Sequence, residues 1–402
     1  IEYSEGGFMN QFQEIYANRH DYARAWKART GGKVLGYIET YMPEELVYAA
    51  GALPVRLLAR HAADDVTDRQ MHGNCYATKD MLRQFIQGEY GYIDGLVHAE
   101  GCQWAFHCYQ NIINNRPDFF NHYVFVPDYP DARTSKNALR SEMEVFKTHL
   151  EQWTGTEITL SAIDRAIDIY NQNRGLLRRL YELRKADFPV VRGSEAMEIM
   201  LACQVMDKAE ANEKLEAFLE EAETRAPGED AVRIMLIGSE TWDAELEKLI
   251  ESLGGNVVID ELDNGSSYFW NEVVWQKDRY MALARRYLER PHHPVKDNNW
   301  RRRPEHIFRL YEDWQADCAV IAKQIYCHPH GTDNYVVWKL LRERHIPYHF
   351  FERDTTLPKA ETSTRIESLV SMVKPGVNRI SGINKVGMFS SVIPSEPREA
   401  TR

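Results

Sequence analysis

Three of the six cysteines in this chain stand where a predicted strand gives way to a predicted helix. Cys75 opens the helix that follows a strand and loop over residues 54–74, Cys102 comes shortly after the next strand, and Cys327 follows a strand over 318–323. In an open parallel sheet, such junctions form the edge where ligands bind. Thiolates at helix N-termini suit an iron–sulfur cluster, because amide N–H groups and the positive helix end stabilise bound negative charge.

A cage of three cysteines would leave one iron of a cluster open to water, substrate or another ligand. The spacing also allows core positions, because cysteine is among the most buried residue types and the chain has no C-x-x-C pair. Cys203 lies on an apolar helical run and Cys318 begins a buried strand, so we interpret both as core residues. Cys108 lies about 600° around a helix from Cys102, which makes it a core residue or a neighbour of the ligands.

Histidines near these cysteines raise two further possibilities. His328 and His330 could form a zinc site with Cys327, although zinc sites usually show paired ligands in both halves of the site. His98 and Glu100 flank the strand end before Cys102 and could carry protons, or His98 could be a hydrogen-bonded cleft residue.

Residues 285–309 are basic in a chain that is acidic overall. They hold eight Lys/Arg against three acids, and Arg301, Arg302 and Arg303 are candidates for binding an anion such as a coenzyme A nucleotide. A solvated face or an acidic partner explains the same composition.

Nucleotide-binding motifs are absent from the sequence. No G-x-G-x-x-G follows a strand and no G-x-x-x-x-G-K-[ST] occurs, so we do not expect this chain to hydrolyse ATP or to hold NAD in the ordinary way. A flavin site of the flavodoxin kind stays possible, because it has no compact signature.

Strand and helix patterns alternate in two separate parts of the chain. The predicted strands cover residues 33–39, 54–59, 95–99 and 123–127, then 232–237, 256–260, 318–323 and 348–352. The predicted helices cover 8–30, 43–50, 75–87 and 104–113, then 242–253, 334–344 and 362–373, with long helices throughout 134–224. Such alternation predicts an α/β fold with two parallel-sheet domains.

These patterns divide the chain into five segments. They are an N-terminal helical segment (1–30), a first α/β domain (31–133), a helical connecting segment (134–230), a second α/β domain (231–374) and an extended C-terminal arm (375–402).

Composition excludes several classes of protein. The 402 residues include 49 Lys+Arg and 60 Asp+Glu, a net charge of −11, which argues against non-specific nucleic-acid binding. No stretch approaches 18 consecutive apolar residues and the first residues show no leader, so we expect no membrane span and a cytoplasmic location. Six cysteines are too few for a disulfide scaffold.

Several segments, in order, resemble the 2-hydroxyacyl-CoA dehydratase and benzoyl-CoA reductase family. HGNCYATKDML and HAEGCQWAFHCYQN each carry one cysteine where that family places a cluster ligand. The resembling segments are 32–59, 72–82, 98–111, 232–240, 257–270, 325–354 and 364–373. Together they span roughly residues 30–375.

The resemblance implies two flavodoxin-like domains around one [4Fe–4S] cluster held by Cys75, Cys102 and Cys327. It also implies partners: a homologous cluster-binding subunit, ATP-hydrolysing activator-type subunits and a low-potential electron donor such as ferredoxin. The reaction would take place on a CoA thioester.

The motifs HAEGCQWAFHCYQN and CHPHGTDN resemble the smaller subunits of benzoyl-CoA reductase more than the dehydratases. This implies ATP-dependent, dearomatising reduction of an aryl-CoA substrate. The HAEGC lead-in departs from the dehydratases, which more often place a hydroxyl residue before the cysteine. The alternatives are a 2-hydroxyacyl-CoA dehydratase subunit, an electron-relay subunit without a substrate site, and a double-cubane reductase relative, which would need more thiolates.

Overall fold

The computed structural model describes residues 8–60, 67, 70–291, 293–296, 302–353 and 359–373. Arg301, the first seven residues and the proposed C-terminal arm at 375–402 lie outside the described residues.

Two four-stranded parallel sheets form the framework of the molecule. The first, in the order β2-β1-β3-β4, contains β1 (Val34–Tyr37), β2 (Leu53–Arg56), β3 (Gly95–Ala99) and β4 (Phe120–Val124). The second, in the order β6-β5-β7-β8, contains β5 (Val232–Gly238), β6 (Gly255–Glu261), β7 (Cys318–Gln324) and β8 (Tyr348–Arg353). Every pair of neighbouring strands is parallel. The order is that of the flavodoxin fold, which confirms the predicted fold class.

Helices cover both faces of each sheet, as a parallel sheet requires. Around the first sheet are α3 (Glu44–Ala49), α4 (Tyr76–Ile86) and α5 (Gln103–Asn115). Around the second are α10 (Glu245–Ser252), α13 (Arg302–Asp313), α14 (His328–Glu343) and α15 (Lys359–Val373). Every residue of β1, β2, β3 and β6 is buried, including the polar residues near the carboxyl ends of β2, β3 and β6.

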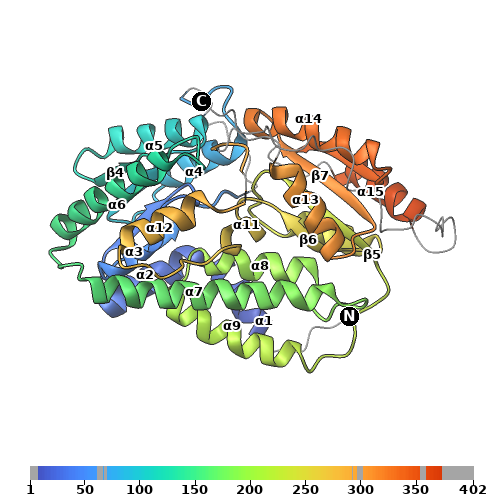
Figure 1. Cartoon of the computed structure of the whole chain (residues 1–402), viewed down its shortest axis with the longest axis horizontal. Helices are drawn as coiled ribbons and strands as arrows, with labels where there is room; N and C mark the ends of the chain where they lie inside the picture. Colours follow the sequence, from blue (N-terminus) through green and yellow to red (C-terminus); the bar gives the residue numbers. More distant parts are fainter. Residues whose placement is uncertain are drawn as a thin grey trace, which may run out of the picture.

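A group of helices lies beneath both sheets and joins them (Figure 1). It contains α1 (Phe8–Ala17), α2 (Arg19–Thr30), α7 (Leu160–Glu182), α8 (Gly193–Cys203) and α9 (Lys208–Ala222). Helix α8 is buried along almost its whole length, and it packs against α1, α7, α10 and β6. It therefore links the N-terminal helices to the second sheet.

One segment of the second half of the chain returns to the first sheet. After the short helix α11 (Ser266–Phe269), helix α12 (Arg279–Leu288) packs against α6 (Arg133–Thr154). Leu283 and Tyr287 of α12 share a buried core with Leu35 of β1. The sequence patterns did not predict α11, α12 or α13.

Three predicted elements differ from the structure by more than small shifts of their ends. The helix predicted over 8–30 is broken at Asn18, whose φ and ψ of −107° and 31° are not helical. The strand predicted over 123–127 is Phe120–Val124, where the chain pairs with β3. The helix predicted from residue 334 begins at His328, because a proline is favourable in its first turn.

Among the described residues, no helix combines the length and the apolar character needed to cross a bilayer.

The basic stretch contributes to the fold rather than to an open anion site. Arg303 is fully buried and pairs with Glu261 of β6 and Asp333 of α14. Arg302 lies at the surface and pairs with Asp131 at 2.8 Å. The hypothesis that Arg303 binds an anionic ligand is therefore wrong, because two carboxylates distant in the sequence already surround it.

We predict that Arg303→Met lowers the free energy of unfolding by about 3–5 kcal/mol, because the substitution leaves two buried carboxylates without their cation. Arg302→Met is the matched control, and it should change the free energy by about 1 kcal/mol or less, since a surface ion pair contributes little. Denaturant unfolding of both variants measures the difference. Equal losses in the two variants would show that the buried network contributes no more than a surface pair.

Candidate metal centre

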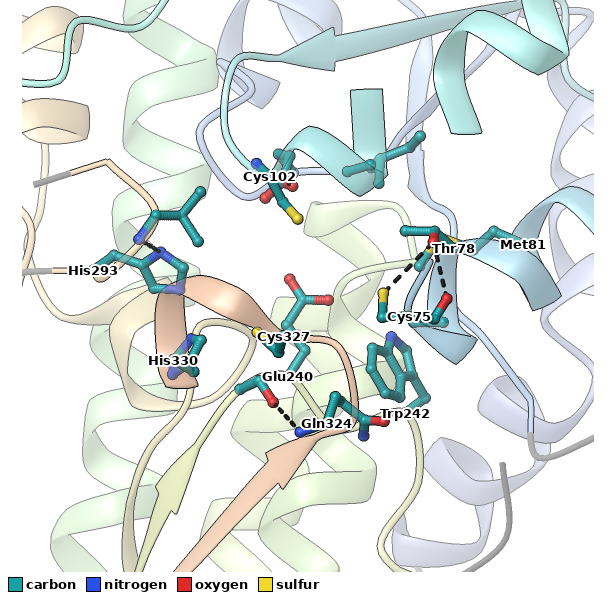
Figure 2. Close-up of a pocket in the computed structure, with 16 residues that line it drawn as sticks. Cys75, Thr78, Met81, Cys102, Glu240, Trp242, His293, Gln324, Cys327 and His330 are labelled. Atoms are coloured by element: carbon teal, nitrogen blue, oxygen red, sulfur yellow. Dashed lines mark hydrogen bonds between the residues drawn. The ribbon is translucent and has the colours of Figure 1, made fainter. Parts of the chain in front are cut away.

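One cavity lies between the two sheets, at the place where the carboxyl ends of their strands point toward each other. Its empty volume is about 560 Å³. Cys75, Cys102 and Cys327 all line it, and Figure 2 shows their side chains directed toward a common space. The structure therefore brings together the three cysteines that the sequence analysis singled out.

The two sheets contribute matching positions to this cavity. Cys102 lies three residues after the end of β3, and Cys327 lies three residues after the end of β7. Glu39 and Glu240 each lie two residues after the end of the strand at the corresponding place, β1 and β5. Cys75, from the segment after β2, has no cysteine counterpart in the second sheet. The cavity is thus a nearly symmetric arrangement of loops with an added third thiol.

Each of the three cysteines is the N-cap residue of a helix. Cys75 precedes α4, Cys102 precedes α5 and Cys327 precedes α14, all with extended backbone geometry. No side-chain hydrogen bond closes these caps. Figure 2 shows the three thiols directed into the cavity.

The local environment acts on these thiols in two opposing ways. Burial raises the pKa of Cys75 and, together with its cysteine neighbours, that of Cys102, and it raises the pKa of Cys327 to about 12. The backbone amides of Thr78, Ala105 and His330, each three residues along, act to lower the pKa of the corresponding thiol. The thiols thus stay protonated until a metal binds, and metal binding would release protons.

The three sulfurs are not grouped as closely as the ligands of a single small metal ion. Ligands around one zinc ion, at about 2.3 Å from the metal, bring their sulfurs to within about 4 Å of one another. Among the described residues, the only set of three candidate ligand groups that lie within 4.8 Å of one another is Glu39, Glu240 and Asp263. The sulfurs of Cys75, Cys102 and Cys327 therefore do not all lie within 4.8 Å of one another.

A buried network of charges joins the two sheets beside the cavity. The Arg56 guanidinium at the end of β2 pairs with Glu240 and lies 3.6 Å from Asp263. Arg290 binds Asp263 at 2.8 Å, and the Thr40 hydroxyl donates to the same carboxylate at 2.6 Å. The three acids thus lie beside two arginines, whose positive charge offsets the negative charge of the acidic cluster.

The three carboxyl groups differ in their protonation. Burial, together with the charge of Asp263, raises the pKa of Glu39, and burial also raises the pKa of Glu240 against the effect of Arg56. Burial acts to raise the pKa of Asp263 as well, but His293, Arg290 and Arg56 hold it well below its usual value. The cavity therefore has one firmly ionised carboxylate behind two carboxyl groups that more readily hold a proton.

A hydrogen bond connects the two loops that carry Cys102 and Cys327. The Trp104 indole N–H donates to the backbone carbonyl of Tyr326 at 3.1 Å. Tyr326 has a φ of 66°, an uncommon conformation for a residue with a side chain. Glu39 supports the first loop, because its carboxylate accepts the backbone N–H of Cys102 at 3.1 Å.

The histidines occupy different positions from those a zinc site needs. His330 is buried in the cavity and packs edge-on against His293 at 5.4 Å between ring centres. His328 is exposed and lies against Trp104. The two imidazoles next to Cys327 thus occupy different environments.

His98 and Glu100 do not line the cavity. His98 is buried among Phe106, Tyr109 and Tyr123, and burial lowers its pKa to about 3. Glu100 pairs with Lys296 at 3.2 Å. Neither arrangement supports the idea that these residues carry protons to the cavity.

Three cysteines lie in the core and not in the cavity. Cys203 and Cys318 are fully buried, as expected from their apolar surroundings. Cys108 is also fully buried in the same core, which agrees with the core interpretation of that residue.

The sequence analysis missed most of the polar residues around the cavity. Glu39, Arg56, Glu240 and Asp263 were not singled out, nor was Trp242. Their common signal is position, because each lies at or within a few residues of the carboxyl end of a strand. The rule that identified the cysteines would have identified these residues too.

A profile of the family described as "2-hydroxyglutaryl-CoA dehydratase, D-component" matches residues 39–373, which include every strand except β1 and all three cysteines of the cavity. The chain belongs to this family. The family resemblance expected from the sequence motifs is thereby confirmed.

Several curated proteins are similar to this chain over most of their own length. The (R)-phenyllactyl-CoA dehydratase beta subunit of Clostridium sporogenes is 23% identical, over 88% of this chain and 95% of the relative. A benzoyl-CoA reductase subunit of Thauera aromatica is 24% identical, over 82% and 88%. The (R)-2-hydroxyglutaryl-CoA dehydratase beta subunit of Acidaminococcus fermentans is 24% identical, over 85% and 92%. Each relative is named as a subunit.

Helix α10 carries a carboxyl group that is almost completely buried. Within the part of the chain that the structure describes, neither oxygen of Glu247 in α10 has a hydrogen-bond partner. Burial raises the pKa of Glu247 to about 8, while Arg353 acts to lower it. The group is therefore held mainly in its neutral form at neutral pH.

The raised pKa of Glu247 makes the stability of the folded chain depend on pH. Between about pH 4.3, where an unfolded glutamate titrates, and about pH 8, the folded chain binds a proton that the unfolded chain has released. The contribution of Glu247 to stability therefore falls as the pH rises through this window.

We predict that Glu247→Gln removes this dependence, so that the melting temperature of the variant rises relative to that of the wild type between pH 5 and pH 8. Thermal unfolding at both pH values measures the change. Glu245→Gln, at an exposed position of the same helix, is the control and should follow the wild type. A difference between Glu247→Gln and wild type that is the same at pH 5 and pH 8 would contradict this account.

Proposed function

We propose that this chain is an iron–sulfur subunit that holds one [4Fe–4S] cluster with Cys75, Cys102 and Cys327. The observation that carries the proposal is the convergence of these three thiols, from both sheets, on one cavity. Their wider spacing and the soft character of their sulfur atoms fit a cluster better than a single hard or borderline ion.

Residues of the chain would bind this cluster and shield it. The three thiolates would serve as ligands, and the amides of Thr78, Ala105 and His330 would stabilise their negative charge. Ile38, Met81 and other apolar residues line the cavity and exclude water. When bound, the cluster would supply one-electron transfer, with a potential set by the hydrogen bonds and burial around it.

We propose that the enzyme is an ATP-dependent aryl-CoA reductase of the benzoyl-CoA reductase type. Support comes from the motifs around Cys102 and Cys327 and from the similarity to a benzoyl-CoA reductase subunit. The reaction would add two electrons and two protons to the aromatic ring and form a dienoyl-CoA. The proposed partners are a homologous cluster-binding subunit, ATP-hydrolysing activator-type subunits and a low-potential donor such as ferredoxin, since this chain has no phosphate-binding loop motif of its own.

The second candidate is a subunit of a 2-hydroxyacyl-CoA dehydratase. It is favoured by the relatives that are dehydratase beta subunits, which are as similar to this chain as the reductase subunit is. The same three cysteines would hold a cluster in either enzyme.

We predict that Cys75→Ser, Cys102→Ser and Cys327→Ser each lose most of the iron and sulfide bound by the wild type, because each removes one ligand of the cage. Cys203→Ser is the control, since Cys203 is buried in the core away from the cavity. The measurement is iron and acid-labile sulfide per chain after anaerobic purification. Undiminished iron and sulfide in Cys75→Ser would contradict the ligand assignment.

The consumption of electrons separates the two enzymes. A reductase uses electrons in proportion to product, whereas a dehydratase returns its electron after each turnover. We predict that the assembled complex, supplied with benzoyl-CoA and a limiting reductant, forms dienoyl-CoA in proportion to the reductant. Turnover of a 2-hydroxyacyl-CoA that continues after the reductant is exhausted would identify the dehydratase instead.

A further inference from the structure

Trp242 places an unused hydrogen-bond donor at the wall of the cavity. It follows β5, lines the cavity and is only 3% exposed. Within the described part of the chain, its indole N–H has no acceptor. Figure 2 shows the ring beside Cys75, with its nitrogen-bearing edge turned toward that cysteine.

A buried indole N–H without an acceptor is costly, by about 1–3 kcal/mol, and most buried polar groups avoid it. Other tryptophans of this chain do have acceptors. Trp314, which is equally buried, donates to the carbonyl of Tyr181 at 3.0 Å, and Trp104 donates to that of Tyr326. Trp242 is therefore an exception that calls for a ligand.

The ring of Trp242 is held in place by a buried cation. The Arg353 guanidinium lies 5.8 Å from the centre of the ring. Arg353 is itself fixed by hydrogen bonds to the Thr241 hydroxyl and to the backbone carbonyl of Glu240. The orientation of the N–H toward the cavity is thus imposed by the packing behind it.

Cys75 itself does not satisfy this donor. Its sulfur contacts the Thr78 hydroxyl at 3.5 Å, and no hydrogen bond joins it to Trp242 among the described contacts. The acceptor must therefore be an atom of whatever fills the cavity.

We propose that the Trp242 indole N–H donates a hydrogen bond to a sulfide of the cluster held by Cys75, Cys102 and Cys327. The inference rests on the proposed function, because it needs the cluster. A donor to sulfide stabilises the reduced form, which carries the greater negative charge, more than the oxidised form. Trp242 therefore raises the reduction potential of the cluster.

The test is the midpoint potential of the cluster in Trp242→Phe, which keeps the ring and removes the N–H. Losing one hydrogen bond should shift the equilibrium between the reduced and oxidised forms about fivefold toward the oxidised form. At 59 mV per tenfold change for one electron, the potential falls by about 40 mV. A redox titration followed by EPR measures it, and Trp314→Phe is the matched control that should leave the potential unchanged.

An unchanged potential in Trp242→Phe with full iron content would overturn this inference and leave the proposed function intact. A wild-type chain without iron and sulfide would contradict both. A second measurement needs no variant: in wild-type protein labelled with ¹⁵N at the indole nitrogens, pulsed EPR of the reduced cluster should show a ¹⁵N coupling. Its absence would also overturn the hydrogen bond.

Discussion

The geometry of the cavity depends on the buried guanidinium of Arg56. This side chain is completely inaccessible to solvent at the end of β2 in the first sheet, and it contacts Glu240 and Asp263, which belong to the second. It also donates to the side chain of Gln204, just after helix α8, at 2.6 Å. Burying a charge is unfavourable without such partners, so these contacts favour the arrangement of the sheets and the helical base in which they form.

This arrangement explains how two flavodoxin-like units can share one site. In such a fold, ligands bind at the carboxyl ends of the strands, and here two such edges face each other. Cys102 and Cys327 occupy equivalent positions after β3 and β7, so a similar loop is used twice. Cys75 breaks the symmetry. Where the first sheet provides this thiol after β2, the second provides Asp263 after β6, which belongs to the charge network instead of the cage.

The sequence was most informative where a single physical rule determines the structure. The strand Gly95–Ala99 was predicted with its observed boundaries, because a buried parallel strand is a short, mostly apolar run. The three cysteines were predicted to face one site, because strand ends in a parallel sheet share an edge. Both inferences need only local sequence and the symmetry of the fold.

The remaining features depend on partners that lie far away in the sequence. Nothing near Arg303 shows that it will be buried against Glu261 and Asp333, so the local run of arginines resembled a solvated or anion-binding face. Arg56 and Glu240 form a buried ion pair although they too lie far apart in the sequence. Helix α12 is amphipathic, but that it covers the first sheet rather than the second is decided by three-dimensional packing.

The central claim is that one cluster lies between the two sheets and is held by three cysteines. The most direct test is an anomalous difference map, recorded at the iron absorption edge from crystals of anaerobically purified protein. We predict iron in the cavity between Cys75, Cys102 and Cys327. Iron at the Glu39, Glu240 and Asp263 carboxylates, or no iron in the cavity, would contradict the account.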